Sequence, residues 1–194
     1  MLGSAQEEPV AEPARARMTA DAFIAWAMEQ PQGRWELDAG EIVAMAPERS
    51  GHALVKAEAW RALSDGVRRA GLRCQAYPDG MAVVVDASTV YEPDASVRCG
   101  EPLRPEAVRF SDPVIVVEVV SPSSRSLDAT RKLVGYFSLP SVRHYLLIDL
   151  HSRAVIHHGR DAEGDIRTRI LREGALRLEP PGLSLEIGDL FATL

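Results

Sequence analysis

"PVIVVEVVSPSS", residues 113–124, is the most apolar stretch of the chain, yet a carboxylate stands at its centre. Six of the seven residues from 114 to 120 are Val or Ile, and the seventh is Glu118. A continuous β-branched run is typical of a strand that is covered on both faces of a sheet. Because an isolated carboxylate is costly to bury, Glu118 must face either a buried partner or a water-filled cleft.

The segments around this strand predict an α/β domain with a central mixed sheet flanked by helices. Apolar residues at helical spacing predict helices over residues 18–30, 50–71 and 124–137, with a short one near the C-terminus in 180–194. Thr19 and Ser50 stand where N-cap residues are expected, and Leu54, Leu63 and Val67 fall close to one stripe of the second helix. Period-two patterns and turn residues predict a hairpin over 34–45 and strands over 72–77, 81–86, 93–97, 114–120, 144–150, 154–159, 166–171 and 176–178.

The 194 residues fit a single domain. Residues 1–17, rich in Ala, Glu, Pro and Arg, are expected to form a disordered leader, and residues 18–194 one domain without a linker. No apolar run approaches the ~20 residues needed to cross a membrane, and no signal peptide is recognisable, so we expect a cytoplasmic protein with no membrane partner. Cys74 and Cys99 are too few for a disulfide framework and are expected to be reduced thiols.

The net charge of −6 counts against broad, non-specific affinity for nucleic acid, because phosphate contacts need basic surface. Any DNA affinity would therefore rely on a metal ion and on local arginines such as Arg68, Arg69 and Arg73. The neighbouring His157 and His158 lie on a predicted strand and point to opposite faces, so we expect no shared metal ion and interpret both as surface histidines.

Carboxylates on two strands are the first candidate site. Side chains alternate along a strand, which puts Glu118 on the same face as Val116 and Val120. In "YEPDASV", residues 91–97, Glu92 and Asp94 are expected to share one strand face. Two carboxylates that point into one cleft repel each other unless a cation lies between them, and a divalent ion with oxygen ligands such as Mg²⁺ is the simplest one.

The helix after the Glu118 strand supplies a second cluster. Asp128, Lys132 and Tyr136 are spaced four residues apart and share one helical face. From there Lys132 could reach the mouth of the cleft and stabilise charge that develops on a phosphate.

Each of these residues also has a purely structural interpretation. Glu118 fits a buried pair with an arginine or lysine, and Asp94 fits a carboxylate that caps a strand end. Lys132 and Asp128 fit a surface ion pair worth roughly 0.3–0.5 kcal/mol. Tyr136 fits a core aromatic residue with its hydroxyl at the rim.

Four motifs in this order carry a resemblance to a known family: "EPDASV", "VIVVEVVSPSS", "DATRKLVGYF" and "RHYLLID". They resemble the Uma-two family of endonucleases, a branch of the PD-(D/E)XK superfamily, and the likeness extends over about residues 18–194. The resemblance implies a restriction-endonuclease-like core, DNA as the substrate and a Mg²⁺ site for which Mn²⁺ substitutes. A homodimer would suit a duplex with two strands to cut.

The resemblance also implies roles for individual residues. Asp94 and Glu118 would be the catalytic metal ligands, with the Val119 carbonyl completing the shell. The superfamily places a lysine two residues after the glutamate, but this chain has Val120 there, and Lys132 is the expected substitute. Glu36 and His52 match further family positions that would border the cleft, and Asp128 and Tyr136 would position the groups around it.

Glu36 also fits a hairpin charge, and His52 a residue of the first helical turn. Two rival functions remain open at this point: a nuclease fold that binds nucleic acid or protein without efficient catalysis, and a structural protein with Glu118 in a buried ion pair.

Overall fold

The computed structural model describes residues 17–120 and 127–194, apart from the side chains of residues 127 and 128. Its helices are α1 (Ala20–Met28), α2 (Ser50–Arg69), α3 (Leu127–Ser138) and the 3-10 helix η1 (Ile187–Phe191). Its strands are β1 (Trp35–Asp38), β2 (Glu41–Ala44), β3 (Cys74–Pro78), β4 (Ala82–Asp86), β5 (Thr89–Tyr91), β6 (Ala95–Cys99), β7 (Arg109–Phe110), β8 (Pro113–Val120), β9 (His144–Asp149), β10 (Ala154–Arg160), β11 (Ile166–Leu171), β12 (Ala175–Leu178) and β13 (Leu183–Glu186). None of the helices in the described part of the chain combines the length and apolarity that a membrane crossing requires.

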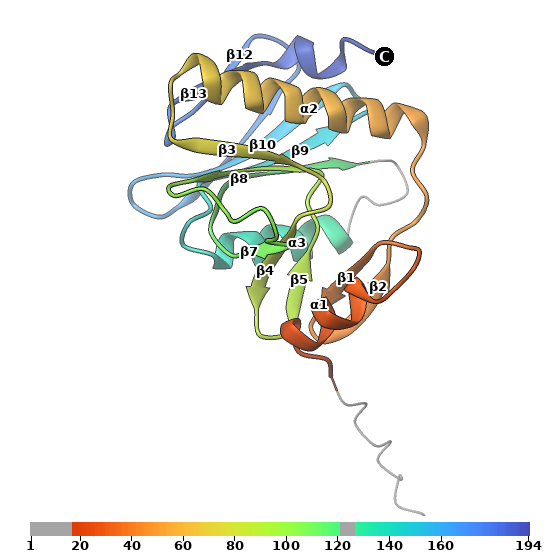
Figure 1. Cartoon of the computed structure of the whole chain (residues 1–194). Coiled ribbons are helices and arrows are strands. Elements are labelled where there is room, and N and C mark those ends of the chain that lie inside the picture. The colour runs from red at the N-terminus through yellow and green to blue at the C-terminus, as the bar shows by residue number, and fades with distance from the viewer. Residues whose placement is uncertain (1–16, 121–126) are drawn as a thin grey trace, which may run out of the picture.

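The central sheet has six strands in the order β11-β10-β9-β8-β6-β3. It is mixed, because β8 pairs in parallel with β9 and antiparallel with β6. Helix α2 and the β12–β13 hairpin lie over one face of this sheet, and α3 lies on the other (Figure 1). The predicted arrangement, a mixed sheet flanked by helices, is confirmed.

Strand β8 is buried on both faces, as its sequence predicts. Ile115, Val117 and Val119 pack in the core beneath α2. Val116 and Val120 belong to the second core, on the side of α3. Glu118 therefore points to the α3 side of the sheet, among apolar neighbours.

A second, five-stranded sheet, in the order β2-β1-β5-β4-β7, lies beside the central one. The predicted hairpin forms its edge: β1 and β2 pair antiparallel through a turn in which Ala39 and Gly40 both have positive φ, of 49° and 86°. Such a turn matches the right-handed twist of the two strands. Helix α1 packs on this sheet, and its N-cap is Thr19, whose hydroxyl accepts a hydrogen bond from the Ala22 N–H at 3.3 Å.

Two expectations for α2 are wrong. Ser50 is the first helical residue rather than the cap, since Arg49 holds the N-cap position without a side-chain capping bond. Leu54 is 44% exposed, whereas Leu63 and Val67 of the expected stripe are buried together with Val55 and Ala59. A shift of one position moves a side chain by about 100° around the helix, so these residues face β8 while Leu54 faces solvent.

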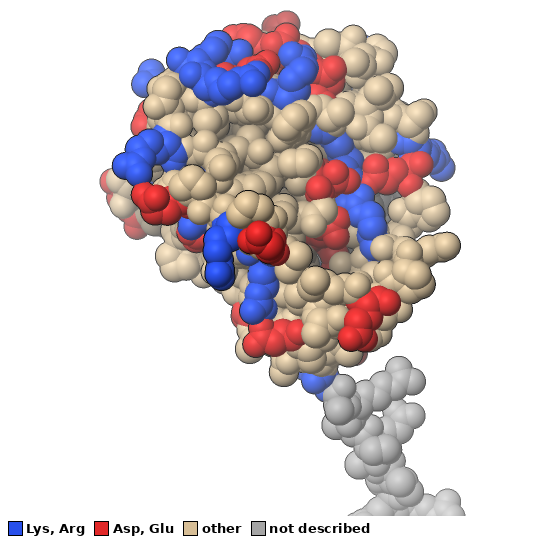
Figure 2. All heavy atoms as spheres, viewed as in Figure 1, with Lys and Arg blue, Asp and Glu red and all other residues tan. Residues whose placement is uncertain are grey.

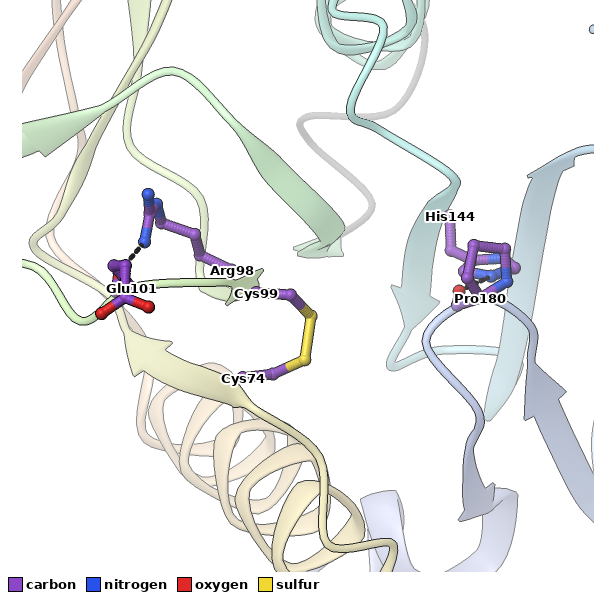
Figure 3. Close-up of a disulfide and its surroundings, with 6 residues drawn as sticks. All are labelled: Cys74, Arg98, Cys99, Glu101, His144 and Pro180. Atoms are coloured by element: carbon purple, nitrogen blue, oxygen red, sulfur yellow. Dashed lines mark hydrogen bonds between the residues drawn. A yellow bond between two sulfur atoms is a disulfide. The ribbon is translucent and has the colours of Figure 1, made fainter.

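The expected reduced thiols are also corrected. Cys74 and Cys99 stand opposite each other on the antiparallel strands β3 and β6, and they form a disulfide (Figure 3). The cross-strand register brings the two side chains together, which spacing along the sequence does not reveal.

His157 and His158 are buried rather than on the surface. As expected for neighbours on a strand, they point to opposite faces. His157 Nε2 lies 2.9 Å from His144 Nδ1, whereas His158 Nδ1 lies 2.8 Å from the Thr168 hydroxyl. His144 also reaches the carbonyl of Pro180 with its other nitrogen, at 2.8 Å, in the loop between β12 and β13 (Figure 3). His157 is thus packed against His144, and His158 against Tyr145 and Thr168 of the neighbouring strands β9 and β11.

Candidate functional site

Asp94 stands directly before β6 and reaches the neighbouring strand β8. Its backbone N–H donates to the Val117 carbonyl at 3.0 Å, and its Oδ2 accepts from the Val119 N–H at 2.7 Å. The side chain is buried, with 4% of the residue exposed. These two bonds hold the Asp94 carboxylate beside the end of β8 that carries Glu118.

Glu118 is buried and meets two side chains of α3. Its Oε1 accepts a hydrogen bond from the Tyr136 hydroxyl at 2.8 Å and one from Lys132 Nζ at 3.1 Å. Lys132 Nζ also donates to Glu36 Oε1, at 2.9 Å, so β1 joins the cluster. The predicted helical face of Lys132 and Tyr136 thus meets Glu118, and the buried ion pair of the structural interpretation is present as well.

Burial raises the pKa of Glu118 to about 8, and the nearby charges of Asp94 and Glu36 act in the same direction. The Lys132 ammonium and the Tyr136 hydroxyl lower that pKa and offset part of the effect. A carboxylate in these surroundings gains from any positive charge placed against it, because an unbalanced anion is costly in a buried site.

Helix α2 approaches the same strand ends with His52. Its Nε2 donates to the Val119 carbonyl at 2.7 Å, which leaves the lone pair on Nδ1 because a carbonyl can only accept. Nδ1 is buried and has no hydrogen-bond partner among the described residues. It lies 3.8 Å from Glu48 Oε2, and single ligand atoms of Glu48, His52 and Asp94 all lie within 4.8 Å of one another.

Lys56 is a site residue that the sequence interpretation missed. It is only 5% exposed, and its Nζ forms ion pairs with Asp94 Oδ1 at 3.0 Å, with Asp79 at 2.8 Å and with Glu48. A lysine in an amphipathic helix usually faces solvent, so its residue type alone did not indicate that Lys56 is buried in the site. The signal was its spacing of four residues from His52, which puts both on one face of α2.

Arg34 extends this charged cluster towards the second sheet. It pairs with Glu92, with Glu48 at 2.9 Å and with Asp79 at 2.8 Å. Acidic and basic side chains accordingly alternate between α2 and the β1–β2 hairpin on the face in Figure 2. Glu92 lies between β5 and β6, so it does not share a strand face with Asp94 as expected.

The expected arginines lie elsewhere. Arg68 pairs with Asp65 and Arg73 with Glu101, while Arg69 ends α2. Arg68 and Arg69 stand at the C-terminal end of α2, about 24 Å along the helix axis from His52, and Arg73 follows the helix. The side chain of Asp128 lies outside the described residues, although its backbone belongs to α3.

The sequence matches the Uma2 family, described as "Putative restriction endonuclease", over residues 20–190. The chain belongs to the Uma2 family. The crystal structure of a "putative nuclease belonging to DUF820" from Anabaena variabilis is similar to this fold, with a TM-score of 0.73 at 18% identity, over 90% of this chain and 98% of the other. The "Uncharacterized protein slr1290" of a Synechocystis strain is 23% identical over 180 residues, 92% of this chain and 93% of its own length.

These comparisons confirm the restriction-endonuclease-like fold class and the Uma2 family suggested by the motifs. The matched range includes β6, β8 and α3, the elements that place Asp94, Glu118 and Lys132.

Proposed function

We propose that this Uma2 protein is a divalent-metal-dependent nuclease that hydrolyses DNA phosphodiester bonds. The observation that carries the proposal is the pair of buried carboxylates, Asp94 and Glu118, at neighbouring strand ends, each already bound to an ammonium group. A site in which both carboxylates need a cation beside them is suited to a small ion of high positive charge.

The donor set fits a metal ion. Both side-chain hydrogen bonds that Glu118 makes with described residues fall on Oε1, which leaves Oε2 for a ligand. Together with Asp94 and the Val119 carbonyl, Glu118 would hold Mg²⁺, with Mn²⁺ as a substitute. Glu48 and the unpaired Nδ1 of His52 would border the ion from α2. When bound, the ion supplies positive charge that polarises the phosphate and makes water a better nucleophile.

Lys132 takes the part of the superfamily lysine in this proposal. Val120, at the usual position, packs in the core on the α3 side and carries no charge. Lys132 reaches the same carboxylate from α3, where Glu36 and Glu118 fix its ammonium group. There it would stabilise the negative charge that grows on the phosphate oxygens. Tyr136 would position Glu118 through their 2.8 Å hydrogen bond, and Asp128 stays a proposed neighbour of the site.

A second function deserves the same test, because Lys56 and Lys132 already balance the two carboxylates. In that case the fold binds nucleic acid or a protein partner without turnover.

The test is cleavage of single-stranded and duplex DNA with Mg²⁺ or Mn²⁺, by wild type, Asp94→Asn and Lys132→Met. Glu101→Gln, whose side chain is 84% exposed at the far end of β6, is the control. The nuclease requires metal-dependent cleavage that Asp94→Asn and Lys132→Met lose while circular dichroism shows them folded, and that the control keeps. DNA binding without cleavage in the folded wild type would instead establish the binding module.

A further inference from the structure

A cavity of about 240 Å³ opens beside the candidate metal site, between α2 and the end of β3. Its lining is charged at one end and apolar at the other, and consists of Glu48, Ala53, Lys56, Ala57, Trp60, Pro78, Asp79 and Asp94. It therefore leads from Asp94, one of the proposed metal ligands, to an indole ring.

Trp60 forms the apolar end and is 38% exposed. Its Nε1–H donates to the Ala76 carbonyl at 3.1 Å, which ties the ring to the edge strand β3. On the same face of α2, Ala57 is about one turn and Ala53 about two turns nearer the N-terminus, and their small side chains leave room over the helix. The result is a fixed, partly open aromatic surface with space beside it.

We infer that this cavity takes an unstacked nucleobase, which makes single-stranded DNA the preferred substrate class; the inference rests on the proposed nuclease function. A base presents a flat π-face that stacks on an aromatic side chain. Within a duplex both faces of each base are covered by its neighbours, so only an unpaired or extruded base can enter.

The charged end suits the rest of a nucleotide. Glu48 and Asp79 are acceptors that can receive hydrogen bonds from the exocyclic amino groups of a base. Lys56 lies between them and Asp94 and forms an ion pair with each of the three, so the phosphate would be met by the proposed metal ion at Asp94. A nucleotide with its base on Trp60 thus has its phosphate directed towards the proposed metal site.

The test is the affinity of the full chain for a single-stranded oligonucleotide of about 12 nucleotides and for the matching duplex, in Ca²⁺ to prevent turnover. Trp60→Ala should weaken single-strand binding about tenfold and leave duplex binding unchanged. Trp60→Phe, which keeps a ring, should retain most of the affinity. Leu54→Ala is the matched control, because Leu54 is 44% exposed on the same helix but does not line the cavity.

Quenching of tryptophan fluorescence in wild type but not in Trp60→Phe would support the stacked base directly. No single-strand binding by wild type, no loss in Trp60→Ala, or an equal loss on duplex would each overturn the inference. A parallel cleavage assay in Mg²⁺ separates the two proposals. Trp60-dependent binding without cleavage supports the base site and rejects the nuclease. Cleavage that is unchanged in Trp60→Ala supports the nuclease and rejects the base site.

Discussion

The Lys132 ammonium group lies between two buried carboxylates, 3.1 Å from Glu118 and 2.9 Å from Glu36. Each carboxylate is therefore balanced by a cation that it shares with the other. Removal of the cation and removal of one anion should consequently have very different effects.

Lys132→Met should destabilise the protein by about 3–5 kcal/mol, because it leaves Glu118 and Glu36 buried without their shared cation. Glu118→Gln should cost less than about 1 kcal/mol, since Lys132 keeps Glu36 as its partner and burial, which raises the pKa of Glu118, disfavours the charge that the substitution removes. Urea unfolding of both variants and of the double variant measures the coupling. A loss on Glu118→Gln as large as that on Lys132→Met would mean that the ion pair serves the fold alone.

Gly135 lets α3 approach β5 closely. A Cβ at this position would lie 2.7 Å from Cε2 of Tyr91, whereas a Cβ at Gly66, in the interior of α2, would find its nearest atoms at 3.5 Å. Gly66→Ala should therefore stabilise the protein by up to about 1 kcal/mol through helix propensity. Gly135→Ala should destabilise it, because the Tyr91 ring is buried and packed edge-on against Tyr136, so it has little room to move away from the added methyl group. Thermal unfolding of the pair decides this, and equal stabilisation of both would contradict the close packing.

His144 and His157 should make the stability of the protein depend on pH. Burial lowers the pKa of each to about 4, and His144 contributes to the effect on His157. Between about pH 4 and 6.5 these two histidines bind protons in the unfolded chain but not in the folded one, so the stability that they contribute is lost as the pH falls through this window and is constant above it. The slope is at most about 1.4 kcal/mol per pH unit for each histidine.

The double variant His144→Gln/His157→Gln isolates this contribution. The difference in the free energy of unfolding between variant and wild type cancels the contributions of the other titrating groups. That difference should change between pH 6.5 and 4.5 and be flat from pH 7 to 8. His151→Gln, at an exposed position, is the control. A difference that does not vary with pH would show that the pair titrates normally.

The Cys74–Cys99 disulfide closes a loop between residues 25 positions apart. A crosslink of this span should stabilise the folded state by about 3 kcal/mol, mainly by restricting the unfolded chain. In urea unfolding, a reductant should lower the stability of wild type by this amount. The stability of Cys74→Ser/Cys99→Ser should be the same with and without reductant. Two free thiols in protein denatured without reductant would refute the pairing.

Local signals in the sequence identified the helices and most strands, but they missed β5, β7 and β13 and most contacts between elements. The β1–β2 hairpin and α1 depend on nearby turn and cap residues, so both were predictable. The disulfide and the buried histidines depend on cross-strand register, which joins distant segments. Lys56 was missed for the same reason: its burial follows from how α2 lies over β6 and β8. Glu118 was recognised because a charge in an apolar strand is anomalous on its own.

Two sets of ligands compete for the proposed metal ion, and Asp94 belongs to both. One set adds Glu118 and the Val119 carbonyl, and the other adds Glu48 and His52 from α2. Calorimetric titration of Mn²⁺ into single variants distinguishes them. Asp94→Asn should abolish saturable binding, with circular dichroism as the check that the variant is folded.

Glu118→Gln should abolish binding as well, while His52→Ala should weaken it about 10–100-fold, as expected for a group that supports the ligands. Loss of binding in His52→Ala and Glu48→Gln with Glu118→Gln unaffected would move the ion to the α2 side. The Glu118–Lys132 pair would then serve the fold, because the Lys132 ammonium group balances a Glu118 carboxylate that does not contact the ion.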